Sequence, residues 1–412
     1  MCYNLITPPT RAGRERKEPD GSTGDLKSPS RTPVVIALGT TQTIAWGSTY
    51  YLPAILARPM AAEFGVKAST VFAMFSLALL LAAIGGPFVG RWIDRFGGRG
   101  MLVASNIVFA AGLLLLGCAP GLAWLWVAWL LMGAGMSMGL YESAFSALAA
   151  AYGSEARAPI TGITLIAGFA STVAWPLTGL LDAEIGWRGA CLVWAAVHIF
   201  ICAPVNRLMI PAGSRVATVE RKAEPAPPPG GDTRAMVLLA YVFTVTWFTS
   251  TAMAAHLPAM LQLAGASAAA AIAAASLVGP AQVAARLFEF TLMRRTHPLL
   301  TARLATLAHP LGAGMLLTFG VPAAAVFTLI HGGGNGVLTI AKGTLPLAIF
   351  GPAGYGLRQG LLSGPARIGQ AAAPLLFGVA LDSFGPGALI ITSLLGISGY
   401  AAMLALGWGK KT

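Results

Sequence analysis

Charge is scarce in this chain of 412 residues. Asp, Glu, Lys and Arg together make up 10% of it, against 56% apolar residues. A soluble protein of this length could not cover its surface with so few charged side chains. Apolar stretches of about 20 residues recur along the chain instead, and each is long enough to cross a bilayer as a helix. The composition excludes a soluble multidomain protein and predicts an all-α membrane protein.

Metal-binding and nucleotide-binding patterns are missing. The four cysteines and five histidines show no metal-ligand spacing, and Gly-x-x-x-x-Gly-Lys does not occur. We therefore expect that the protein binds no cofactor and is neither an enzyme nor an ATP-driven pump. The N-terminus also lacks the apolar segment of a signal peptide. Residues 1–33 are polar, basic and rich in Pro and Ser, which predicts a disordered tail.

Twelve apolar segments are predicted to form membrane helices, six on each side of a charged, Pro-rich stretch. We assign 34–209 and 235–408 to two six-helix bundles, 210–234 to a linker and 409–412 to a C-terminal tail. The predicted helices are 34–57, 69–92, 100–118, 121–150, 159–181, 188–209, 235–263, 267–293, 299–318, 321–350, 355–381 and 386–408.

Lys and Arg orient these helices. Most of the 27 fall on the side that would hold the N-terminus, the linker and the C-terminus, and Arg358 and Arg367 are assigned to that side. Because positive charge is retained in the cytoplasm, both termini and the linker are predicted to be cytoplasmic, in a bacterial inner membrane. The basic residues follow one membrane face and form no groove, so nucleic acid is not an expected partner.

The two halves also repeat each other in sequence. Three pairs of segments match in the same order, with offsets of 195 to 205 residues, which indicates two copies of a six-helix unit in parallel arrangement. The pairs are Tyr51–Pro53 with His256–Pro258, Gly90–Asp94 with Ala285–Glu289, and Pro176–Ala190 with Pro374–Ala388.

The stretch GRWIDRFGGRGML after the second predicted helix resembles the loop signature of the major facilitator superfamily, with Gly98 in place of one expected base. The resemblance covers about residues 34–408. It implies twelve transmembrane helices in two six-helix pseudo-repeats, a monomer, and transport by alternating access with this loop at the inner gate. The residues that match the signature are Gly90, Asp94, Arg95, Gly97, Arg99 and Leu102.

Four ionisable residues lie well inside predicted helices: Glu142, Arg286, Glu289 and Lys342. Each costs about 2.5–3.5 kcal/mol at the bilayer centre, so such residues usually face a cavity or a partner. Glu142 and Lys342 are 200 positions apart, which makes them near-equivalent in the repeat. They either form an ion pair across the two halves, or Lys342 binds an anion while Glu142 carries a proton.

Arg286 follows Gln282 by one helical turn. This pattern is similar to helix 8 of the monocarboxylate transporters and the oxalate–formate exchanger, and the resemblance implies that Arg286 binds a substrate carboxylate. Gln282 stands where monocarboxylate transporters have an acid, which leaves proton coupling at this site open. The rival interpretation places Arg286 and Glu289 in the gate, as the second copy of Arg91 and Asp94.

Milder candidates for the cavity wall are Tyr51, His256 and Asn335. Two functions follow. The first is a secondary transporter of a small organic anion, with proton coupling left open. The alternative is a proton-driven efflux pump for a neutral or cationic toxic compound, with Glu142 as its proton site. Both need a small-molecule substrate and a lipid bilayer.

Overall fold

The computed structural model describes residues 31–211, 233–291, 296–350 and 355–406. Most of the predicted N-terminal tail, the linker and the C-terminal tail lie outside these residues, so those assignments stay predictions. Throughout the described part the regular structure is helical and contains no strand.

The N-terminal half holds the helices α1 to α9, with two short helical turns among them. Three predicted helices are each built from two shorter ones: the first from α1 and α2, the fourth from α5 and α6, and the fifth from α7 and the start of α8. The bounds are α1 Arg31–Ser48, α2 Pro53–Glu63, α3 Ala68–Phe96, α4 Gly98–Gly117, α5 Leu122–Gly139, α6 Tyr141–Tyr152, η1 Gly153–Ala156, α7 Arg157–Ala167, α8 Ala170–Val197, η2 His198–Cys202 and α9 Ala203–Met209.

The C-terminal half holds α10 to α16, again with two short turns. Four of its helices run for 22 to 31 residues without a break. The bounds are α10 Thr233–Leu263, α11 Ala268–Ser276, α12 Val278–Thr291, α13 Pro298–Phe319, η3 Val321–Ala323, α14 Ala324–Phe350, α15 Tyr355–Phe384, η4 Gly385–Gly387 and α16 Ala388–Ala405.

Eight helical stretches of the described residues are long and apolar enough to cross a membrane. Two of them, Ala158–Met209 and Leu361–Ala405, contain 52 and 45 residues, more than one crossing requires. The first of these turns at Gly186, whose φ of +73° interrupts the helix. An all-helical membrane fold is thus confirmed, whereas the count of twelve crossings stays a prediction.

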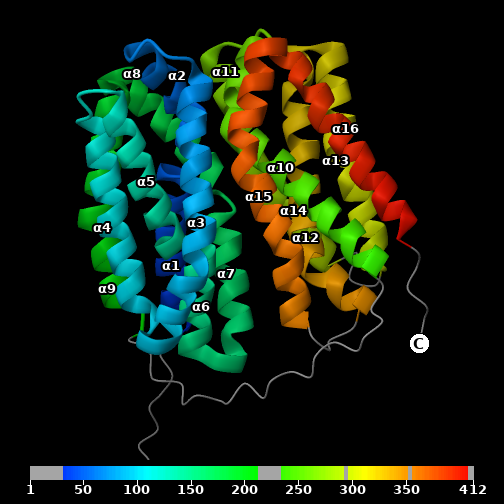
Figure 1. The fold of residues 1–412 in the computed structure, drawn as a ribbon, viewed down its shortest axis with the longest axis horizontal. Coiled ribbons are helices and arrows are strands. Elements are labelled where there is room, and N and C mark those ends of the chain that lie inside the picture. Colours follow the sequence, from blue (N-terminus) through cyan, green and yellow to red (C-terminus); the bar gives the residue numbers. More distant parts are fainter. Residues whose placement is uncertain (1–30, 212–232, 292–295, 351–354, 407–412) are drawn as a thin grey trace, which may run out of the picture.

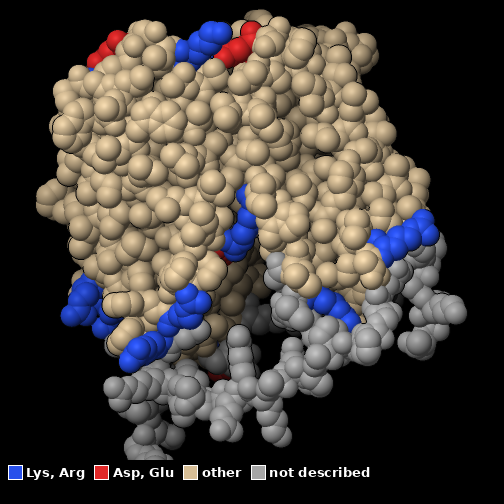
Figure 2. All heavy atoms as spheres, viewed as in Figure 1, with Lys and Arg blue, Asp and Glu red and all other residues tan. Residues whose placement is uncertain are grey.

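The two halves stand side by side, and we call the end with α2 and α11 the upper end (Figure 1). Apolar side chains join the halves there: Ala54 and Trp175 share a core cluster with Met253 and Leu257 of α10. Toward the lower end each half has a core cluster of its own, one around Leu239 and one around Leu38, Leu148 and other N-terminal residues. Figure 2 shows a notch between the halves that opens at the lower end and contains Lys or Arg side chains.

The connection between α3 and α4 is a single residue, Gly97, with a φ of +82° that favours glycine. Gly98 then starts α4 so close to α6 that an added Cβ would lie 2.0 Å from the Cβ of Ala147. The base expected at this place in the loop signature therefore has no room. The departure from the family pattern follows from helix packing.

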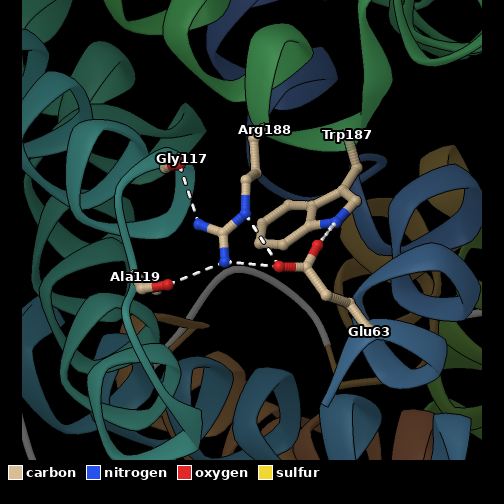
Figure 3. A network of polar contacts seen from close by, with 5 residues as sticks. All are labelled: Glu63, Gly117, Ala119, Trp187 and Arg188. Atoms are coloured by element: carbon tan, nitrogen blue, oxygen red, sulfur yellow. Dashed lines mark hydrogen bonds and ion pairs between the residues drawn. The ribbon is translucent and has the colours of Figure 1, made fainter. Parts of the chain in front are cut away.

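A polar clamp closes the upper end of the N-terminal half (Figure 3). Arg188 of α8 donates to Glu63 at the end of α2 over 2.7 Å, and to the carbonyl oxygens of Gly117 and Ala119 between α4 and α5. The indole of Trp187 donates to the same carboxylate over 2.7 Å. The hydrogen bonds from Arg188 lower the pKa of Glu63 below its ordinary value.

Candidate functional site

Arg286 of α12 lies where the two halves meet. Its Nη1 donates to the carbonyl oxygen of Thr164 in α7 over 3.3 Å, which bridges the halves. Its Nε is buried without a hydrogen bond, and among the described residues Arg286 forms no ion pair. Gln282, one turn earlier, is buried where α12 packs on α14. The guanidinium thus keeps hydrogen-bonding capacity in a place screened from bulk water.

Lys342 of α14 brings a second cation to this region. Its Nζ is 4.2 Å from the ring centroid of Trp247 in α10, a cation–π contact. Lys342 is partly accessible although protein surrounds it, and it lies within electrostatic range of Arg286. Arg286 and Lys342 of the C-terminal half therefore act on each other electrostatically inside the molecule.

Tyr51 and Tyr141 of the N-terminal half lie within electrostatic range of Arg286 as well. Both are surrounded by protein yet partly accessible, so they border an internal space. Tyr51 belongs to the break between α1 and α2, and Tyr141 to the start of α6, just after the break at Leu140. The sequence predicted Tyr51 as a cavity residue and missed Tyr141, although its position beside Glu142 was a usable signal.

Glu142 forms an ion pair with Arg367 of α15 and so joins the two halves. The alternative pairing of Glu142 with Lys342 is not what the structure has. Arg367 was assigned to the cytoplasmic side by the charge rule, but it lies inside α15, and its side chain is only 29% exposed. The side chain of Glu142 is 54% exposed, so it is not the buried acid that a dedicated proton site suggests.

The predicted gate residues lie at or near the lower ends of α3 and α12. Gly90 belongs to α3, and Arg95 is exposed and lies over the ring of Phe96. Arg99 donates from Nε to the carbonyl oxygen of Ile210, which ties the α3–α4 turn to the end of α9. The side chain of Asp94 lies outside the described part of the structure, so its role stays a prediction.

Glu289 of α12 is half-buried, and its Oε2 has no hydrogen-bond partner among the described residues. The structure forms no ion pair between Glu289 and Arg286 within the part it describes. The interpretation that joins these two residues in a gate therefore has no contact to support it, and the placement of Glu289 in the gate stays a prediction.

His256 is fully enclosed at the contact between the halves. Its Nε2–H donates to the carbonyl oxygen of Pro374 over 2.8 Å, and its ring lies 3.8 Å from that of Phe72 in α3. The neighbouring Leu375 donates its N–H to the hydroxyl of Ser76 over 3.1 Å. These contacts join the halves tightly, so the structure places His256 in the seam and does not bring it to the two cations.

Asn335 lines a cavity of about 30 Å³ inside the C-terminal half, between α10, α13, α14 and α16. The cavity is bordered by His331, whose Nδ1 is 3.0 Å from Nδ1 of His309, and His309 Nε2 is 2.9 Å from the Thr392 hydroxyl. That hydroxyl donates to Leu389, so neutral His309 donates to Thr392 and accepts from His331. The Nε2 of His331 is then left as an acceptor, and the cavity volume suits one or two water molecules.

The chain matches the family model of the Major Facilitator Superfamily over residues 38–325. It belongs to this superfamily. The resemblance inferred from the α3–α4 loop is thereby confirmed.

Curated relatives cover parts of this chain. Monocarboxylate transporter 3 of Rattus norvegicus is 28% identical over 200 residues, which are 47% of this chain and 39% of that protein. Monocarboxylate transporter 14 of Homo sapiens is 29% identical over 128 residues, 31% of this chain and 25% of that protein. The aligned part of the chain therefore spans two-fifths or less of the length of these relatives.

Solved transporter structures share the fold. A nucleoside transporter, NupG, superimposes with a TM-score of 0.74 at 12% identity, covering 91% of this chain and 99% of that one. A bacterial homologue of the human lysosomal transporter Spinster, in an inward-facing conformation, gives a TM-score of 0.69 at 17% identity, covering 92% and 97%. At these identities the likeness establishes the fold and says nothing of the substrate.

Proposed function

We propose that this protein is a secondary transporter that carries a small organic anion through the space between its halves by alternating access. The single observation that carries the proposal is Arg286, a screened guanidinium at the seam with unused hydrogen-bonding capacity and no acidic partner among the described residues. A guanidinium favours a planar carboxylate, which it binds with two parallel hydrogen bonds. Lys342 adds a second positive charge near it.

The arrangement of the halves supports alternating access. The apolar contacts between them gather at the upper end, while the lower end is notched (Figure 2). The sequence predicts that the lower end faces the cytoplasm of a bacterium, which makes this the inward-open arrangement of a monomer in the inner membrane. Partial similarity to two monocarboxylate transporters agrees with an anionic substrate.

Glu142 contributes to this cycle by holding the two halves together. Its ion pair with Arg367 bridges the halves beside the notch. Loss of the negative charge at Glu142 would abolish the ion pair and loosen the contact between the halves. In the alternative efflux pump Glu142 would be the proton site, and a partly exposed carboxylate paired with Arg367 does not favour that role.

The test is transport by purified protein in liposomes. We expect flux of organic carboxylates, and we expect Arg286→Gln to lower it at least about 30-fold, since losing a desolvated charge partner costs about 2–5 kcal/mol. Arg286→Lys should retain part of the flux. Arg207→Gln, at an exposed arginine of α9, is the matched control and should transport like the wild type. Full carboxylate flux in Arg286→Gln would overturn the proposal.

A further inference from the structure

Six aromatic rings form a continuous series along the N-terminal half. Each ring centroid lies 4.9 to 5.4 Å from the next. The series begins on α6, passes along the end of α1 and through the break after it, and ends on α8. Its members in order are Phe145, Tyr141, Trp46, Tyr50, Tyr51 and Trp175.

The two buried members of this series are fixed by hydrogen bonds. The Tyr50 hydroxyl donates to the hydroxyl of Thr251 in α10 over 2.7 Å, and the Trp175 indole donates to the carbonyl oxygen of Tyr51 over 3.3 Å. These bonds use the one donor of each side chain and hold both rings in place. Tyr50 and Trp175 are therefore structural members.

The other four members are partly accessible: Trp46, Tyr51, Tyr141 and Phe145. In the part of the chain that the structure describes, neither the Tyr51 nor the Tyr141 hydroxyl has a hydrogen-bond partner, and neither atom is sealed from the internal space. Tyr141 and Phe145 lie nearly parallel, with 12° between their planes. The internal space thus has an aromatic wall with two unsatisfied hydroxyl groups.

The cations stand within range of this wall. Arg286 acts electrostatically on both Tyr51 and Tyr141, and Lys342 lies over Trp247, a partly buried ring of the C-terminal half. Trp247 also has an indole N–H that is buried without a partner. One side of the space therefore supplies positive charge, and rings border it from both halves.

We infer that the substrate class is a carboxylate that carries an aromatic ring. The carboxylate would bind Arg286, and the ring would lie against Tyr141 and Phe145. Aromatic pairs prefer offset-stacked or edge-to-face arrangements that a saturated ring of the same size cannot reproduce. A short aliphatic acid would reach the cations and leave the aromatic wall uncovered. The inference rests on the proposed function and goes beyond it in naming what accompanies the negative charge.

The experiment compares benzoate with cyclohexanecarboxylate and propanoate in liposome flux. Benzoate and cyclohexanecarboxylate share charge and ring size and differ in the π-system. We expect the wild type to prefer benzoate by about 2- to 10-fold over cyclohexanecarboxylate, the range that aromatic pairs provide beyond buried area. Tyr141→Leu and Phe145→Leu should each bring the ratio of benzoate flux to cyclohexanecarboxylate flux close to one.

Phe200→Leu is the control, because Phe200 is an aromatic residue that is 77% exposed on the outside of the N-terminal half. It should leave the ratio unchanged. Equal flux of benzoate and cyclohexanecarboxylate in the wild type, or transport of propanoate alone, would overturn the inference. The proposed function would survive either result as long as Arg286→Gln still stops the flux of the anion that is carried.

Discussion

The two halves contain a matching short segment, Tyr51-Leu-Pro53 in one and His256-Leu-Pro258 in the other. The two segments have different local structures. In the N-terminal half the helix stops at Ser48 and starts again at Pro53 as α2. In the C-terminal half α10 runs through Pro258 and continues to Leu263. Sequence similarity between the copies therefore does not carry over into identical local structure.

The residues before each proline explain the difference. In the N-terminal half the Thr49 hydroxyl bonds the carbonyl oxygen of Ala45 over 2.6 Å, and the Ser48 hydroxyl lies 2.7 Å from Nε2 of His198. Such side-chain bonds compete with the helix and favour a bend or a stop. The corresponding stretch of α10 is rich in alanine, the strongest helix former. The helix therefore continues through Pro258 although proline lacks the N–H for one backbone hydrogen bond.

The difference separates two roles. The broken half turns the aromatic rings of Tyr50 and Tyr51 out of helical register and into the ring series. The other half carries the two cations, Arg286 on the short helix α12 and Lys342 on the 27-residue helix α14. Divergence after duplication has thus placed aromatic surface on one side of the space and positive charge on the other.

After Arg286→Gln, the largest expected effect comes from removing the second cation, Lys342. Lys342→Gln should lower carboxylate flux about 10-fold or more, because hydrogen bonds to charged groups contribute about 1.5–3 kcal/mol. Lys342→Arg should retain more flux than Lys342→Gln. Flux into liposomes is the measurement, and Lys67→Gln, at an exposed lysine, is the control. Equal flux in Lys342→Gln and the control would remove Lys342 from the site.

The next largest effect is expected at the hydrogen bond between Tyr50, in the break after α1, and Thr251 of the other half. Tyr50→Phe removes the hydrogen bond to Thr251 and should lower the free energy of unfolding by about 0.5–1.5 kcal/mol. The measurement is a double-mutant cycle with Thr251→Val in detergent. Tyr241→Phe is matched, since the Tyr241 hydroxyl bonds Ser398 at an exposed site within one half. Additive effects of the two changes would show that Tyr50 and Thr251 are not coupled.

A smaller effect is expected from the ion pair beside the notch. Glu142→Gln should shift the population toward wider separation of the lower ends, by no more than about 1 kcal/mol because the pair is partly exposed. The shift would be measured as the distance between two spin labels. The labels are attached to cysteines introduced at Arg95 and Arg234 after the native cysteines have been replaced. The exchanged pair Glu142→Arg with Arg367→Glu should restore the wild-type distribution. Failure of the exchange to restore it would mean that the charges do not act as a pair.

The smallest effect is a pH dependence at the clamp. The pKa of Glu63 is lowered in the folded protein, so its stabilising contribution is complete above the ordinary pKa of about 4.5 and is lost as the pH falls below it. Glu63→Gln should therefore lower the thermal midpoint at pH 7 and differ less from the wild type near pH 3. Glu184→Gln, at an exposed carboxylate of the same half, is the control. A constant difference between Glu63→Gln and the wild type at all pH values would contradict this assignment.

The sequence allowed the helical membrane fold and the superfamily to be predicted, because apolar length and the α3–α4 loop signature are local properties. The site was harder to predict. Arg367 looked like one more basic residue of the lower side, and only the course of α15 shows that it meets Glu142. Tyr141 was not predicted to border the internal space, because its position there depends on α6 starting directly after Leu140. Partners across two halves cannot be derived from the period of a single helix.

The clamp around Arg188 has a mechanical consequence. One guanidinium is bonded to three oxygen atoms from two separate segments, and its carboxylate partner is held by a neighbouring indole as well. A helix bundle that is cross-linked by hydrogen bonds at one end resists sliding of its helices against one another. In the proposed transport cycle we therefore expect displacement to concentrate at the contact between the halves, with the N-terminal bundle rotating as a stiff unit about the apolar contacts at its upper end.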